Sequence, residues 1–136
     1  MKKVLYLVYA LMFSALIMRG SCKKSSGGGG SNEATLDVEL NPPAGSNQAA
    51  SPGPDFPLIV TIKSAMPPSG VKIDVAAKQD GSTSTFFSQS INSTSATNTF
   101  TITNSPRSVT LRVDVTVTSL TNSSNKWTGG YTYSRK

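Results

Sequence analysis

Hydrophobic and polar residues alternate with a period of two along most of the chain after residue 33. In the clearest stretch, 109–118, valine or leucine occupies every second position, and polar residues such as Arg112 and Asp114 lie between them. Successive side chains of a β-strand point to opposite faces, so this pattern predicts strands with one buried and one exposed face. Turn-forming residues separate such stretches, which together predict about seven strands, at 35–40, 56–62, 71–78, 83–91, 99–103, 109–118 and 127–133.

The fold class follows from the strand number and from the lack of helical patterning. No segment after residue 18 has the 3.6-residue period of an amphipathic helix. Seven short strands with half-buried faces predict an all-β fold, an antiparallel β-sandwich of about seven strands. In size and strand number the region 34–136 resembles immunoglobulin-like and fibronectin type III-like domains, although it lacks the Cys–Trp–Cys core of antibody domains. A small barrel is the alternative architecture.

One connection between predicted strands is unusually long. The segment 41–57 contains five prolines and no alternating pattern, and structureless loops of this length are uncommon in compact domains. We expect it to cross from one sheet of the sandwich to the other, and the alternative is a binding loop. Shorter connections are predicted at Asp80-Gly81, which favours a tight hairpin turn, and at 122–125.

The N-terminus has the pattern of a secretory signal. Lys2 and Lys3 precede fifteen uncharged, mostly apolar residues, 4–18, whereas a transmembrane helix needs about 20. A helical signal peptide is therefore predicted at 1–21, and its last two residues, Gly20 and Ser21, precede the single cysteine, Cys22. The sequence Gly20-Ser21-Cys22 resembles the lipobox of bacterial lipoproteins, with an arginine at position 19 where that family usually has leucine.

The resemblance implies an anchored protein. The signal peptide would be cleaved before Cys22, and Cys22 would carry the lipid, with palmitate as an expected acyl group. The expected location is the bacterial cell envelope, in the outer membrane, with the domain on the periplasmic face or at the cell surface. Residues 22–33 then form the lipid acceptor and a flexible Gly/Ser-rich tether, of which 23–32 have a reach of about 17 Å, and residues 34–136 form the sandwich.

Composition excludes several kinds of chemistry. The chain has no histidine and one cysteine, which excludes an internal disulfide, a Cys/His zinc site and a catalytic pair of a nucleophile with histidine. We therefore expect no enzymatic activity, no cofactor and no metal. Three of the thirteen basic residues precede Cys22 and the others are scattered. No nucleic-acid partner is expected, because nucleic-acid-binding proteins cluster these residues on one face.

Aromatic residues are the remaining candidates for recognition. The candidate binding surface consists of Phe86, Phe87, Trp127, Tyr131 and Tyr133. Exposed aromatic rings are enriched in binding sites. For the three on the last strand, which share one parity, core packing is the favoured interpretation and an exposed binding surface is the alternative. Phe86 and Phe87 are neighbours, so one of their rings is expected to leave the core face.

Three functions are compatible with these features. The first is an envelope lipoprotein that binds or scaffolds a protein partner. The second is a carbohydrate-binding module that uses the aromatics of the last strand. The third is a small hydrolase, which the absence of histidine disfavours.

Overall fold

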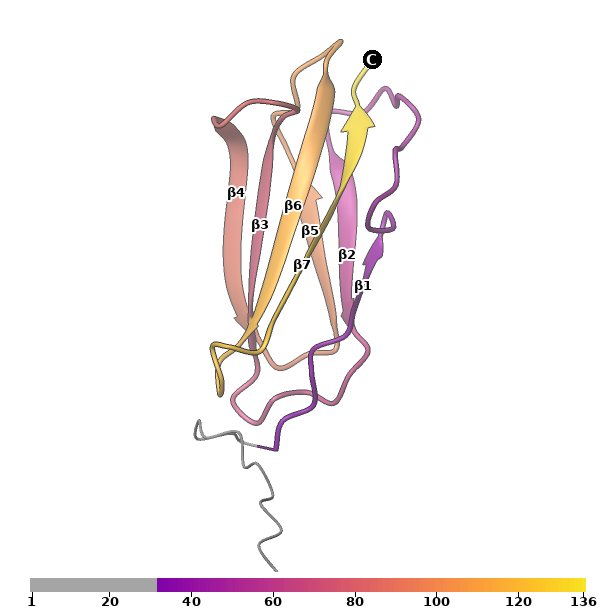
Figure 1. Ribbon diagram of the computed structural model, residues 1–136. Coiled ribbons are helices and arrows are strands. Elements are labelled where there is room, and N and C mark those ends of the chain that lie inside the picture. The colour runs from indigo at the N-terminus through magenta and orange to yellow at the C-terminus, as the bar shows by residue number, and fades with distance from the viewer. Residues whose placement is uncertain (1–31) are drawn as a thin grey trace, which may run out of the picture.

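The computed structural model describes residues 32–136 (Figure 1). The predicted signal peptide, the lipid acceptor Cys22 and nearly all of the predicted tether lie outside these residues. Within residues 32–136 there is no helix of the length and apolarity needed to cross a bilayer.

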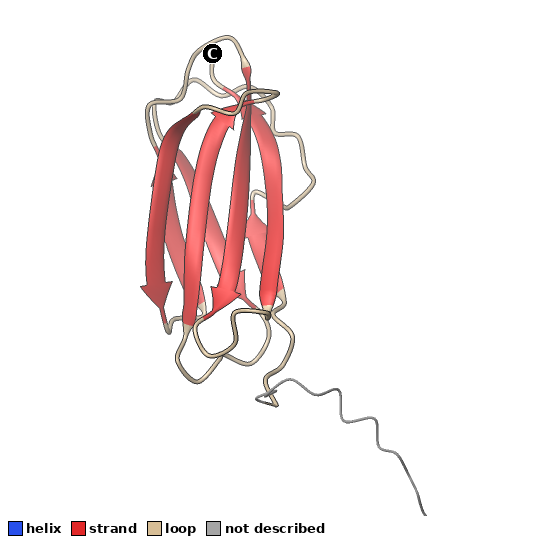
Figure 2. Ribbon diagram, turned by 60° about the vertical axis from the view of Figure 1, so that its left-hand side comes forward, coloured by secondary structure: helices blue, strands red, loops and turns tan. Residues whose placement is uncertain are grey.

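Seven antiparallel strands form two sheets that pack face to face, as Figures 1 and 2 show. One sheet has three strands in the order β1-β2-β5, and the other has four in the order β4-β3-β6-β7. The prediction of an all-β, seven-strand antiparallel sandwich is confirmed. The strands are β1 (Val38–Asn41), β2 (Phe56–Ile62), β3 (Val71–Gln79), β4 (Thr85–Ser93), β5 (Thr97–Ile102), β6 (Thr110–Ser119) and β7 (Lys126–Ser134).

The alternating pattern explains the core between the sheets. In β6 the side chains of Val113 and Val115 are buried, while Arg112 is exposed and Asp114 is half-buried. Both central strands of the larger sheet follow this rule, since β3 pairs with β6 so that Val75 lies opposite Val115. The inward positions of the two sheets therefore meet in one apolar cluster, to which every strand except β4 contributes buried side chains.

The position of the fourth strand distinguishes this sandwich from the constant-type immunoglobulin fold. In the constant-type immunoglobulin fold the fourth strand joins the sheet of the first two, whereas here β4 pairs with β3 as the outer strand of the other sheet. A turn at Asp80-Gly81 makes this hairpin, as predicted. Gly81 has a φ of +81°, a conformation that glycine adopts without steric cost, and the N–H of Ser82 donates to the carbonyl of Gln79 at 2.9 Å.

The proline-rich segment does not connect one sheet to the other. The strands that it joins, β1 and β2, are neighbours in the same sheet, which corrects the expectation of a crossover. The segment instead leaves the edge of β1, lies along β7 of the opposite sheet and returns to β2. The N–H groups of Gly45, Gln48 and Ser51 donate to β7 carbonyls at 2.7, 2.8 and 3.1 Å, and Ser46 accepts a hydrogen bond from β7. The loop therefore covers the edge of β7.

The two ends of the sandwich differ. The described chain begins at Asn32, at the end that also holds the β2–β3, β4–β5 and β6–β7 connections (Figure 1). There Asn125, in the predicted 122–125 turn, fixes the first residues of the domain. Its Nδ2 donates to the Glu33 carboxylate and to the Ala34 carbonyl, and its Oδ1 accepts from the N–H of Leu36 at 2.9 Å. We call the end of the sandwich at which the described chain begins the proximal end. The opposite end, where the proline-rich loop and the C-terminus lie, is the distal end.

Candidate binding surfaces

The tyrosines of the last strand are core residues. Tyr131 and Tyr133 are only 3% and 2% exposed, and the Tyr133 ring packs against Phe56 with ring centroids 4.5 Å apart. The hydroxyls of Tyr133 and the buried Ser105 share a hydrogen bond of 2.6 Å. Burial raises the pKa of both tyrosines. Neither ring offers an exposed stacking face in this structure.

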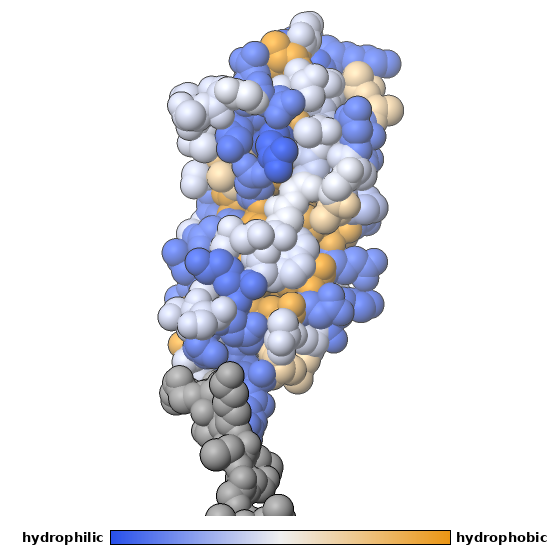
Figure 3. Space-filling view, viewed as in Figure 1, coloured by the Kyte–Doolittle hydropathy of each residue, from blue (hydrophilic) through white to orange (hydrophobic). Residues whose placement is uncertain are grey.

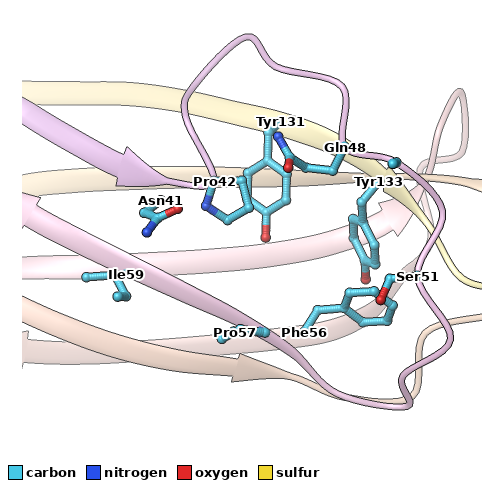
Figure 4. A pocket seen from close by; sticks show the side chains of 10 residues that line it. Asn41, Pro42, Gln48, Ser51, Phe56, Pro57, Ile59, Tyr131 and Tyr133 are labelled. Atoms are coloured by element: carbon cyan, nitrogen blue, oxygen red, sulfur yellow. The ribbon is translucent and has the colours of Figure 1, made fainter.

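Both tyrosines nevertheless line a cavity of about 240 Å³ near the distal end. Figure 4 shows their rings projecting from β7 toward β2, beneath the proline-rich loop. Side-chain amides of Asn41 and Gln48 also line it, and the rest of the wall is mostly apolar. Among the described residues, the Tyr131 hydroxyl is buried and has no hydrogen-bond partner. The structure thus brings two of the predicted aromatics and the long loop together at one site.

Trp127 lies near the start of β7, closer to the proximal end than the two tyrosines, and is half-buried. Its indole ring covers the Cα of Gly129, where any larger residue would collide with the ring. It packs against the edge of the core and is not among the residues that line the distal cavity. Trp127 is therefore a partly exposed ring held flat against its own strand.

Phe86 and Phe87 lie on β4, the outer strand on the opposite side of the same sheet from β7. The five predicted aromatics consequently do not form one continuous strip. The β3–β4 register shifts so that Phe87 lies opposite Ala77 and Thr85 opposite Lys78, which leaves Phe86 without a paired residue. This β-bulge lets both half-buried rings pack against the core cluster. Strict alternation predicted that one of the two rings leaves the core face, but neither ring does.

The unpaired edge of β4 is a candidate surface that sequence reasoning missed. β4 pairs with β3 on one side only, and no other strand of the described chain pairs with it. Its inward positions are incompletely covered, because Ile91 is half-buried and Gln89 is exposed. The signal in the sequence is a run without charges: residues 81–106 contain no Asp, Glu, Lys or Arg. Charged side chains are one of the ways in which proteins protect edge strands against pairing.

The two carboxylates on the strands of the larger sheet, Asp74 and Asp114, are ion-paired on its outer face. Lys78 of β3 and Arg112 of β6 contact the Asp114 carboxylate at 3.0 and 2.8 Å, and the contact with Lys78 joins two neighbouring strands. Partial burial acts to raise the pKa of Asp114, but hydrogen bonds from Arg112 and Lys78 outweigh it and leave the pKa below its usual value. Asp74 is paired with Lys72. These carboxylates are ion-paired surface groups.

The face seen in Figure 3 is largely hydrophilic, with apolar areas scattered among polar side chains. Within residues 32–136, Asp, Glu, His and Cys side chains do not gather in groups of three that could hold a metal ion. No family model, curated protein or solved structure matches the chain.

Proposed function

We propose that the protein is a non-enzymatic lipoprotein of the bacterial cell envelope, which binds a protein partner through its immunoglobulin-like sandwich. The apolar run 4–18 followed by Gly20-Ser21-Cys22 supports the anchor. The described domain begins at the proximal end, so a tether from Cys22 would hold that end toward the bilayer. The long outer strands and the distal end would then be presented to partners.

The observation that supports a protein partner most directly is the unpaired edge of β4. It offers a row of unpaired backbone groups over nine residues, about 30 Å of strand, and strands of other chains add to such edges. Phe86, Phe87 and Ile91 place half-buried apolar side chains beside it. By contrast, the proline-rich loop occupies much of the opposite edge, at β7. β5 is also an outer strand without charges, but it has six residues where β4 has nine, so strand addition at β4 is the mode of recognition that the fold favours.

A matched pair of variants tests this function in the membrane fraction. Ser88→Lys adds a charge to the exposed outer face of β4, and Thr128→Lys adds the same charge to the exposed outer face of β7. Chemical cross-linking and affinity capture of the full chain should yield an adduct of the wild-type chain with its protein partner. Ser88→Lys should lose this adduct and Thr128→Lys should keep it. If both variants keep the adduct, β4 is not the binding edge.

The distal cavity favours a second candidate, a carbohydrate-binding module. Its amide side chains and the unpaired hydroxyl of Tyr131 are groups that can form hydrogen bonds with sugars. A glycan array probed with the wild-type chain and with Tyr131→Phe tests it. Selective binding of a glycan that the variant loses would support this candidate, and no binding on the array would count against it.

A further inference from the structure

We propose, resting on the function above, that the partner at the β4 edge is a second copy of this chain. The two copies would pair antiparallel, β4 against β4, about a two-fold axis through Gln89. Two four-stranded sheets would then join into one continuous sheet of eight strands across the dimer.

Residue order in β4 is self-complementary about Gln89. An antiparallel strand paired with its own copy at Gln89 sets Phe87 opposite Ile91 and Ser88 opposite Ser90, on both sides of the axis. Phe87 and Ile91 share the inward face of the sheet, since they lie opposite Ala77 and Ile73 of β3. Pairs of an aromatic and a β-branched residue stabilise neighbouring strands, and an interface with two-fold symmetry must be self-complementary in this way.

The register is specified by the apolar positions. A shift of the axis to Ser90 would set Phe87 opposite Ser93 and Ile91 opposite Gln89, so that each apolar side chain would meet a polar one. The axis at Gln89 uses the residues 87–91, which lie beyond the bulge at Phe86, where the pairing of β4 with β3 is regular. The bulge therefore marks one limit of the paired stretch.

Charge also favours a second copy at this edge. From Cys22 onward the chain has ten basic and seven acidic residues, a net charge of +3, so identical surfaces that carry lysine or arginine repel each other. The uncharged run 81–106 contains the whole of β4 and β5, so two copies meeting here bring no like charges together. The paired stretch is short, so the association should be weak in solution and strengthened when both copies are held on one membrane.

The antiparallel geometry has a consequence for anchored copies. The proximal ends of the two copies point in opposite directions along the paired strands. Copies anchored in one membrane must therefore tilt away from the orientation in which the proximal end faces the bilayer, so that the paired strands lie along its surface and both tethers reach it.

A single cysteine placed on the axis tests the register. In the full chain with Cys22→Ser, purified in detergent, Gln89→Cys is the only thiol and would face its own copy. Directly paired residues have Cα atoms about 4.5–5.5 Å apart, which fits a disulfide. Asn92→Cys is the matched control, because it is exposed on the same strand but would lie about 20 Å from its copy, six residue steps of the strand. Mild oxidation should cross-link Gln89→Cys at least ten times faster than Asn92→Cys.

A charge at the axis gives an independent measurement. Gln89→Lys would set two lysines directly opposite each other, while the exposed position leaves the single copy intact. Sedimentation of the full chain should show a concentration-dependent dimer that Gln89→Lys shifts to monomer with an unchanged melting temperature. Equal cross-linking of the two cysteine variants, or a wild-type chain that stays monomeric, overturns the proposal of a second copy.

The experiments distinguish a failure of strand addition at β4 from a failure of the proposal that the partner is a second copy. If no homodimer forms but Ser88→Lys still abolishes capture of a different envelope protein, strand addition at β4 stands and the second copy is wrong. If the homodimer is absent and Ser88→Lys changes no adduct, both proposals fall.

Discussion

Two tyrosines on β7 should respond in opposite ways to loss of the hydroxyl group. Tyr131 and Tyr133 are almost equally buried, but only Tyr133 has a hydrogen-bond partner, the hydroxyl of Ser105. In Tyr133→Phe the 2.6 Å bond is lost and the Ser105 hydroxyl, itself 1% exposed, is left unpaired. The expected cost is about 1–3 kcal/mol of the free energy of unfolding. In Tyr131→Phe an unpaired buried hydroxyl is removed, so stability should be unchanged or higher by about 1 kcal/mol.

Urea and thermal unfolding of the two variants measure this difference. For a domain of this size each kcal/mol corresponds to a shift of about 4–8 °C in the melting temperature. Tyr133→Phe should therefore melt several degrees lower than the wild type, and Tyr131→Phe should not. If both variants lose the same stability, the Tyr131 hydroxyl has a partner such as a buried water, and the reasoning is refuted.

Alkaline pH gives a second measurement on the same pair. Burial raises the pKa of Tyr131 above that of the unfolded chain, near 10, so the folded state holds this proton more tightly. The contribution to stability is complete below about pH 10 and is lost as pH rises through the folded-state pKa. Tyr131→Phe should make the loss of stability above pH 10 less steep, and an unchanged slope would contradict the assignment.

Three further perturbations test the core, the loop and the anchor. Val113→Asp should unfold the domain because it buries an unpaired charge, whereas Asp114→Asn, at a half-buried and ion-paired site, should cost about 1 kcal/mol or less; equal effects in urea unfolding would contradict the register. Gln48→Pro removes the N–H that donates to β7 and should cost about 1 kcal/mol in the same assay, and an unchanged midpoint would mean that the loop adds no stability. Cys22→Ala should move the full chain from the detergent phase to the aqueous phase, and unchanged partitioning would exclude the lipid anchor.

The positions of the strands were predictable from sequence because alternation is a local property. The β6 pattern of valine against charged residues marks both the strand and its buried face, and the observed burial follows it residue by residue. The choice of sheet for each strand is not local. The Asp80-Gly81 turn predicts that β4 pairs with β3, but nothing in the sequence of β4 indicates that its other side stays unpaired at the outer side of the four-stranded sheet, since that depends on which chain segments meet in space.

The proline-rich loop shows a second limit of sequence analysis. Its prolines and polar residues predict irregular structure, and the backbone hydrogen bonds that it makes to β7 leave no trace in the side-chain pattern. Deletions that include Ser51, whose N–H donates to β7 and whose carbonyl accepts from Lys136, should therefore destabilise the domain. Chain-closure entropy alone, which changes slowly with loop length, would predict almost no effect.

The candidate surface was only partly predictable for the same reason. Inward parity correctly placed Tyr131 and Tyr133 on the core side of the last strand, whereas the bulge at Phe86 shifts the parity of β4 and draws both phenylalanines to one side. A bulge depends on pairing with the neighbouring strand, so adjacent phenylalanines in a sequence do not indicate it.

The two outer strands of the larger sheet differ in a way that stability alone does not explain. A long segment covers much of the edge of β7 with backbone hydrogen bonds, which is one of the ways in which proteins prevent unwanted strand pairing. Apart from the bulge at Phe86, the edge of β4 has no charge, no proline and no covering segment among the described residues, although a single lysine at the exposed Ser88 or Gln89 would protect it. Such a lysine would cost the folded domain little at an exposed position. An edge left open where protection is so readily available is best explained by a partner that pairs with it, and the symmetry of its residues about Gln89 favours a second copy of the same strand.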